Sequence, residues 1–136
     1  MDVHKVKPLL PENSFKRLQR ICRSSYKNFP YSEEFGRYFI NDKEFKPLAS
    51  YLEHLVPLAR DAFNTETLVP SYAIFAHYEG NQAALPKHKD NNACTYTIDL
   101  CLYQITPWGL WVEDREYMLE ENEALAFYGE DQEHWR

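Results

Sequence analysis

The stretch TYTIDLCLY, residues Thr95–Tyr103, decides the fold of this chain. Its apolar residues alternate along the stretch, so that Tyr96, Ile98, Leu100 and Leu102 share one face of an extended segment. This alternation predicts a β-strand with one face turned toward a core. Several short strands separated by turn residues indicate a sandwich or barrel. Further strands are predicted in the same half of the chain, over 71–78, 110–113, 117–119 and 124–128.

The part of the chain before this strand-rich half has a helical pattern. Apolar residues recur at helical spacing over 14–26 and over 43–63, with Asp42 as a candidate N-cap of the second helix. Pro57 is expected to kink the second helix or to end it early. We therefore expect one domain over residues 1–136, in which a helical cover over 1–66 packs on strands formed by 67–136.

Composition limits the classes of function. The chain has 136 residues and a net charge of −6, and its acidic groups are concentrated in the second half, which argues against a nucleic-acid groove there. Its three cysteines form no CxxC motif, which fits reduced thiols and a cytoplasmic protein. We expect no signal peptide and no membrane partner, because the sequence has no apolar run of the required length.

Three polar residues of the strand-rich half form a candidate metal site. His88 and Asp90 make an HxD pair, and side chains two positions apart on an extended segment point the same way. A further imidazole completes the two-histidine, one-carboxylate set that suits non-haem Fe(II) and oxygen chemistry. His134 can supply it, because the gap after Asp90 holds about four strands, enough to return the chain beside the HxD segment. His77 is a spare candidate, although a histidine on a strand is more often packed or hydrogen-bonded.

Arg136 is a candidate for binding a co-substrate. It follows His134 by two positions, so the two side chains share a face if this segment is extended. A guanidinium holds a carboxylate through two parallel hydrogen bonds, and an oxoacid that chelates iron at one end needs such a partner at the other. The alternative is an ordinary exposed arginine.

These features resemble the Fe(II)/2-oxoglutarate-dependent oxygenases, particularly the prolyl-4-hydroxylase-like group. The resemblance covers residues 72–136 and implies an α+β, mainly β fold, a double-stranded β-helix (jelly roll) with N-terminal helices packed on one sheet. It also implies that His88, Asp90 and His134 are the catalytic ligands of Fe(II), and that Tyr78 lies in the pocket near 2-oxoglutarate. The segments that carry the resemblance are YEG (78–80), HKD (88–90), CTYTIDLCL (94–102), LAFYG (125–129) and HWR (134–136).

The sequence departs from this group at two places. Its members usually carry the cation for the distal carboxylate on a strand after the distal histidine, and a fold ending at Arg136 would lack this final strand. We therefore expect either that Arg136 takes this role or that the native protein continues and this chain is cut short. Residues 81–87 lack the aromatic residue that many prolyl hydroxylases have there, which leaves open whether the substrate is a small molecule or a peptide. The leading interpretation is a hydroxylase. The alternatives are a cupin-like metal-binding or sensor domain without turnover, and a hydrolase that activates water on Zn(II) with the same triad.

Overall fold

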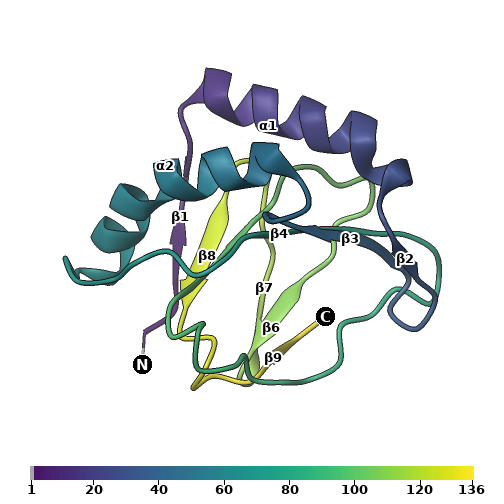
Figure 1. The fold of residues 1–136 in the computed structure, drawn as a ribbon. Coiled ribbons are helices and arrows are strands. Elements are labelled where there is room, and N and C mark those ends of the chain that lie inside the picture. The colour runs from purple at the N-terminus through teal and green to yellow at the C-terminus, as the bar shows by residue number, and fades with distance from the viewer. Residues whose placement is uncertain (1) are drawn as a thin grey trace.

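Two helices lie together on one side of a set of short antiparallel strands (Figure 1). The structure is a computed structural model and describes residues 2–136. Within this range no helix has the length and apolar character needed to span a membrane. Along the chain the elements are β1 (His4–Val6), α1 (Glu12–Ser25), a 3-10 helix (Tyr26–Asn28), β2 (Tyr31–Ser32), β3 (Arg37–Asn41), α2 (Lys46–Phe63), β4 (Ile74–Tyr78), β5 (Thr97–Leu100), β6 (Leu110–Val112), β7 (Arg115–Tyr117), β8 (Ala124–Phe127) and β9 (His134–Trp135).

Helix α1 is held to the rest of the domain by one apolar stripe. Phe15, Leu18 and Cys22 are three and four positions apart, so they share a face, and all three are buried. Their partners in the first core cluster come from β3, β4 and α2. Glu12 in the first turn and Arg23 in the last turn have the charges that the helix dipole favours.

Helix α2 begins three residues later than predicted. The side chain of Asn41 accepts two backbone N–H groups of the following residues and holds them in a turn. Asp42 is therefore not the N-cap, and its carboxylate instead accepts a hydrogen bond from the backbone N–H of Ala73 at 3.0 Å. The helix continues through Pro57, so of the two expected outcomes an early end is wrong and a kink stays a prediction. It stops at Asn64, which has the left-handed conformation.

Four of the predicted strands are present with shorter bounds, and the one predicted over 117–119 lies earlier, at Arg115–Tyr117 (β7). Three further strands precede residue 66. The prediction that residues 1–66 form only a helical cover is therefore wrong, because they also contribute strands β1, β2 and β3. Strand β1 pairs with β8, placing His4 opposite Ala126, and β3 pairs with β4 along its whole length. These partners are distant in sequence, so short strands such as β1 leave no local signal.

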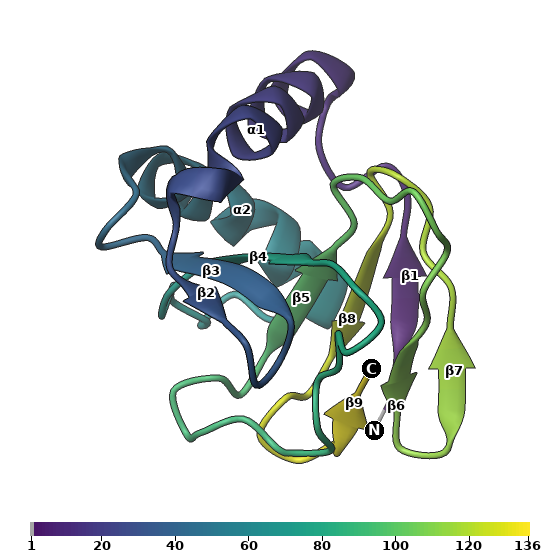
Figure 2. The same cartoon turned by 90° about the vertical axis from the view of Figure 1, so that its right-hand side faces the viewer.

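The strands form three antiparallel sheets, ordered β1–β8–β5, β2–β3–β4 and β7–β6–β9 (Figure 2). Strand β8 is central in the first sheet, and all four of its residues are buried. Leu125 and Phe127 of β8 form a second core cluster with Leu110 and Val112 of β6, so the first and third sheets face each other across it. The mainly β architecture with two helices agrees with the predicted fold class, while the jelly roll itself stays a prediction.

Candidate metal centre

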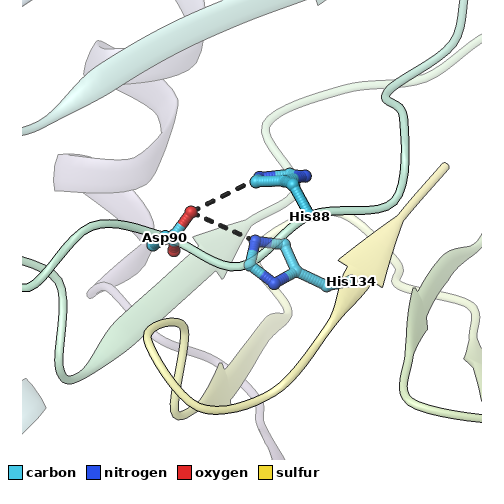
Figure 3. A group of neighbouring side chains, drawn as sticks. All are labelled: His88, Asp90 and His134. Atoms are coloured by element: carbon cyan, nitrogen blue, oxygen red, sulfur yellow. Dashed lines mark ion pairs between the residues drawn. The ribbon is translucent and has the colours of Figure 1, made fainter.

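His88, Asp90 and His134 converge on one point of the structure (Figure 3). The Nε2 atoms of the two histidines lie 3.4 and 3.3 Å from Oδ1 of Asp90, and the potential ligand atoms all lie within 4.8 Å of one another. Two ligands at right angles, each about 2.1 Å from a metal, stand roughly 3 Å apart. The spacing therefore fits three ligands on one face of a single ion, and the structure brings together the residues that the sequence selected.

Backbone pairing sets the positions of the two histidines. The N–H of His88 donates to the carbonyl of His134 at 3.1 Å, and the N–H of His134 donates back to His88 at 2.9 Å. Directly opposed residues of an antiparallel pair project to the same face, and here the two ring centroids are 4.3 Å apart. The backbone of Asp90, two residues after His88, is held by a hydrogen bond in which its N–H donates to the carbonyl of Gly129 at 2.8 Å.

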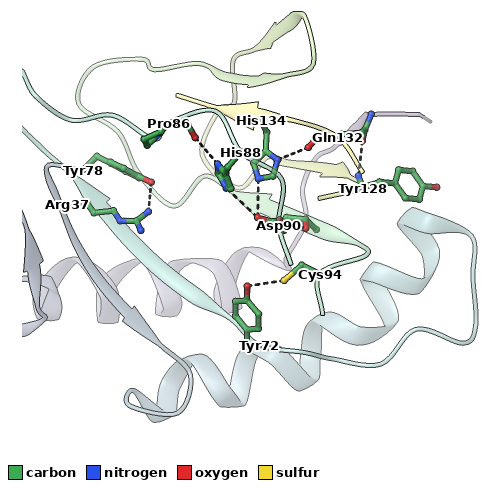
Figure 4. Close-up of polar contacts among 11 residues, drawn as sticks. Arg37, Tyr72, Tyr78, Pro86, His88, Asp90, Cys94, Tyr128, Gln132 and His134 are labelled. Atoms are coloured by element: carbon green, nitrogen blue, oxygen red, sulfur yellow. Dashed lines mark hydrogen bonds and ion pairs between the residues drawn. The ribbon is translucent and has the colours of Figure 1, made fainter. Parts of the chain in front are cut away.

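The outer nitrogens of both imidazoles are occupied by backbone carbonyls (Figure 4). Nδ1 of His88 lies 2.7 Å from the carbonyl oxygen of Pro86, and Nδ1 of His134 lies 2.9 Å from that of Gln132. A carbonyl can only accept, so each Nδ1 carries a proton, and Nε2, which faces Asp90, is the nitrogen of each ring left to bind a metal. Second-shell hydrogen bonds of this kind are typical of metal-binding histidines.

Gly129 and Thr97 fix the carboxylate of Asp90. The Thr97 hydroxyl donates to Oδ2 at 3.1 Å, which leaves Oδ1 facing the two histidines. A Cβ at position 129 would stand 2.2 Å from Oδ2 of Asp90 and 2.3 Å from the Thr97 hydroxyl oxygen. Only glycine therefore allows the carboxylate this close to the backbone that follows β8.

The triad is coupled electrostatically. Burial alone would raise the pKa of Asp90, but the contact with His134 outweighs it and lowers the pKa. Burial would likewise lower the pKa of His134, and the hydrogen bond to Asp90 together with the Gln132 carbonyl raises it instead. Asp90 is thus held as a carboxylate, the form in which it binds a cation.

An open cavity of ≈ 1700 Å³ adjoins the triad. Helix α2 and strands β4 and β5 contribute much of its lining, as do all three triad residues. In the described part of the chain β4 pairs only with β3, and β5 pairs only with β8, so each has a free edge. The cavity gives a substrate access to the triad.

Arg136 lies on the same extended segment as His134 and lines this cavity, as the sequence predicts. Its guanidinium is already engaged, because Nη2 lies 3.0 Å from Oδ1 of Asp99 and Nη1 donates to the carbonyl of Trp108 at 3.3 Å. Asp99 therefore neutralises the cation that the sequence nominated for an oxoacid carboxylate.

Tyr78 also lines the cavity, and its hydroxyl accepts a hydrogen bond from Nη1 of Arg37 at 2.9 Å (Figure 4). The ring of Tyr78 packs edge-on against Trp108. Arg37 also lines the cavity, and no motif or spacing in the sequence selects it. Its neighbours in the aromatic run FGRYFIN (35–41) are the only local signal that it belongs to a strand.

His77, the spare ligand candidate, is not part of the triad. Its Nδ1 lies 2.7 Å from the Tyr103 hydroxyl, and its ring stacks on Tyr26 with centroids 3.8 Å apart. The packed and hydrogen-bonded interpretation of this histidine agrees with these contacts.

Comparisons with known proteins give a structural match but no sequence match. No protein-family model matches the sequence, and no curated protein sequence matches it. The structure is similar to the crystal structure of a Pseudomonas putida prolyl-4-hydroxylase, with a TM-score of 0.71 and 18% sequence identity. The match covers 98% of this chain and 83% of that chain. The chain therefore shares the fold of this hydroxylase.

Proposed function

We propose that this protein is a non-haem Fe(II)- and 2-oxoglutarate-dependent oxygenase that hydroxylates a small molecule or a peptide. The main support is the triad, in which two Nε2 lone pairs and one carboxylate oxygen converge without any rearrangement. This donor set leaves positions open on an iron ion and suits Fe(II) better than a site built from thiolates. The fold shared with a prolyl-4-hydroxylase is the second support.

The residues of the chain hold and orient the reactants in this proposal. His88, Asp90 and His134 would hold Fe(II), and the open cavity beside them would hold the oxoacid and the substrate. Bound Fe(II) and 2-oxoglutarate supply the oxidising chemistry, in which O2 is consumed and the oxoacid loses CO2. The backbone carbonyls of Pro86 and Gln132 hold a proton on Nδ1 of each imidazole and keep Nε2 turned toward the metal position.

Anaerobic titration of the metal-free protein with Fe(II), followed by 2-oxoglutarate, tests this function. We expect one equivalent of iron to bind and the oxoacid then to produce a metal-to-ligand charge-transfer band. His88→Ala should abolish iron binding. His54→Ala is the matched control, because His54 is exposed on α2, and it should leave both steps unchanged.

A cupin-like metal-binding or sensor domain without turnover is the second candidate. The ion pair between Arg136 and Asp99 favours it, since the cation expected to hold the oxoacid already has a partner. The two candidates differ in one step of the titration. Iron binding without any response to 2-oxoglutarate would rule out the oxygenase and support the binding domain.

A further inference from the structure

Arg37 is a partly buried cation without a matching anion. Its Nε is fully buried and has no hydrogen-bond partner in the structure. Within residues 2–136, the ion pairs closer than 4.0 Å involve other residues, and none includes Arg37. A buried charge without a counter-charge is costly, so native structures pair such a group or hold it for a ligand.

Two arginines that line the same cavity therefore differ in whether a carboxylate lies beside them. Arg136 lies 3.0 Å from the carboxylate of Asp99. Arg37 contacts only a neutral hydroxyl and aromatic faces, since its guanidinium carbon is 4.4 Å from the ring centroid of Phe39 and 5.7 Å from that of Tyr78. Aromatic faces orient a guanidinium but do not neutralise it.

Tyr78 completes a site made of hydrogen-bond donors. Arg37 and Tyr78 are directly opposed across β3 and β4, so their side chains project to the same face of this sheet. The Tyr78 hydroxyl accepts from Nη1 of Arg37 and keeps its own proton free to donate. Guanidinium N–H groups beside one O–H group match the two oxygens of a carboxylate.

We propose that Arg37 and Tyr78 bind the remote carboxylate of the 2-oxoacid, in the role that the sequence assigns to Arg136. This inference rests on the proposed function, because it needs an oxoacid in the cavity. The triad and both of these residues line that cavity, and Trp108 contacts Tyr78 on one side and Arg136 on the other. Arg136 then serves a structural role with Asp99.

Anaerobic binding of two oxoacids to the Fe(II)-loaded protein tests the inference. 2-Oxoglutarate carries the remote carboxylate, whereas 2-oxobutyrate has the same chelating end without it. Arg37→Gln should weaken 2-oxoglutarate by about 10- to 100-fold, the usual loss for a charge-assisted hydrogen bond, and leave 2-oxobutyrate unchanged. Tyr78→Phe keeps the ring packing on Trp108 and should cause a smaller loss with the same selectivity. The readout is equilibrium binding, so it does not depend on turnover.

Two controls keep the test decisive. Arg20→Gln removes an exposed cation of α1 and should change neither affinity. If Arg37→Gln does not fold, Arg37→Lys keeps the charge but loses the planar fork, and it should still weaken 2-oxoglutarate selectively. If the ratio of the affinities for 2-oxoglutarate and 2-oxobutyrate is unchanged in the Arg37 and Tyr78 variants, this inference is overturned while the proposed function stands. An iron-loaded wild-type protein that binds neither oxoacid would overturn the proposed function as well.

Discussion

Strand β8 and helix α2 both contribute to the wall of the cavity, yet they are packed very differently. All four residues of β8 are buried, and the strand is paired along both edges. Only Leu48 and Phe63 are buried among the 18 residues of α2. Leu55, on the inner side of this helix, is only partly buried because it borders the open cavity.

The difference in packing corresponds to the part of the site that each element supports. His134 packs edge-on against Phe127 of β8, and Asp90 is fixed by Gly129 just after that strand. The candidate metal ligands therefore depend on the closely packed side, where small displacements are resisted. The loosely packed side of α2 and β4 borders the open cavity, which would hold the oxoacid and substrate of the proposed reaction.

Replacing Phe127 by Ala should give the largest effect. Phe127 is 1% exposed, so its removal leaves a cavity that should lower the free energy of unfolding by about 3–5 kcal/mol. Leu55→Ala, at a partly buried position, should cost only about 1 kcal/mol. Urea unfolding of the two metal-free variants measures both losses. Equal losses would show that the two walls are equally well packed.

Gly129→Ala should damage the metal site with a smaller effect on stability. The new Cβ would collide with the carboxylate of Asp90 and the hydroxyl of Thr97, so the carboxylate must move away from the two histidines. We expect metal affinity to fall by about 10- to 100-fold, as for other supports of metal ligands. Titration with Co(II) or Fe(II), followed spectroscopically, measures the affinity.

Gly109→Ala is the control for this substitution. The three atoms nearest to its added Cβ all belong to the side chain of Glu116, which is exposed and can turn away. The metal affinity of this variant should equal that of the wild type. A Gly129→Ala protein with wild-type affinity would show that the close approach of Asp90 is not needed.

His77 and His134, which both line the cavity, should have pKa values shifted in opposite directions in the metal-free protein. Burial lowers the pKa of His77 below its ordinary value of about 6.5, whereas the contacts of His134 with Asp90 and the Gln132 carbonyl outweigh burial and raise its pKa. The contribution of His77 to stability is therefore present above pH 6.5 and lost as the pH falls through its lowered pKa. That of His134 is present below pH 6.5 and lost as the pH rises through its raised pKa.

NMR titration of the imidazole signals in the metal-free protein measures both pKa values. His77→Gln should remove part of the loss of stability in acid, while His134→Gln should remove part of the loss above neutral pH. A pKa of His77 above that of His134 would contradict the environments described for the two rings.

The sequence predicted the parts of the fold and site that depend on local patterns. The alternation over 95–103 revealed β5, and the spacing of His88 and Asp90 revealed two groups on one face of an extended segment. His134 was found because the length of the intervening chain allows its return. The missed strands β1 and β3 pair with β8 and β4, which lie far away in the sequence. Strand β2 pairs with the nearby β3 but has only two residues, too few for a visible alternation.

The charge balance of the cavity could not be predicted from the sequence. Arg136 was nominated from its distance to His134, but its partner Asp99 lies 37 positions away in the sequence. Arg37 was not predicted as a site residue, because arginine is mostly exposed and no strand was predicted around it. Whether an arginine has a counter-charge depends on contacts between distant elements, and those follow from the fold.

Hydrogen exchange should show the smallest difference between the two sides. Strand β8 is hydrogen-bonded on both edges, so its amides should be among the slowest to exchange. Strands β4 and β5 each have one free edge at the cavity within the described structure, and amides directed to that edge should exchange at least about tenfold faster. Mass spectrometry of peptides covering 74–78 and 124–127 measures this ratio. Equal protection would mean that a further strand or ligand covers the free edges in solution, and the cavity would then be smaller than the structure indicates.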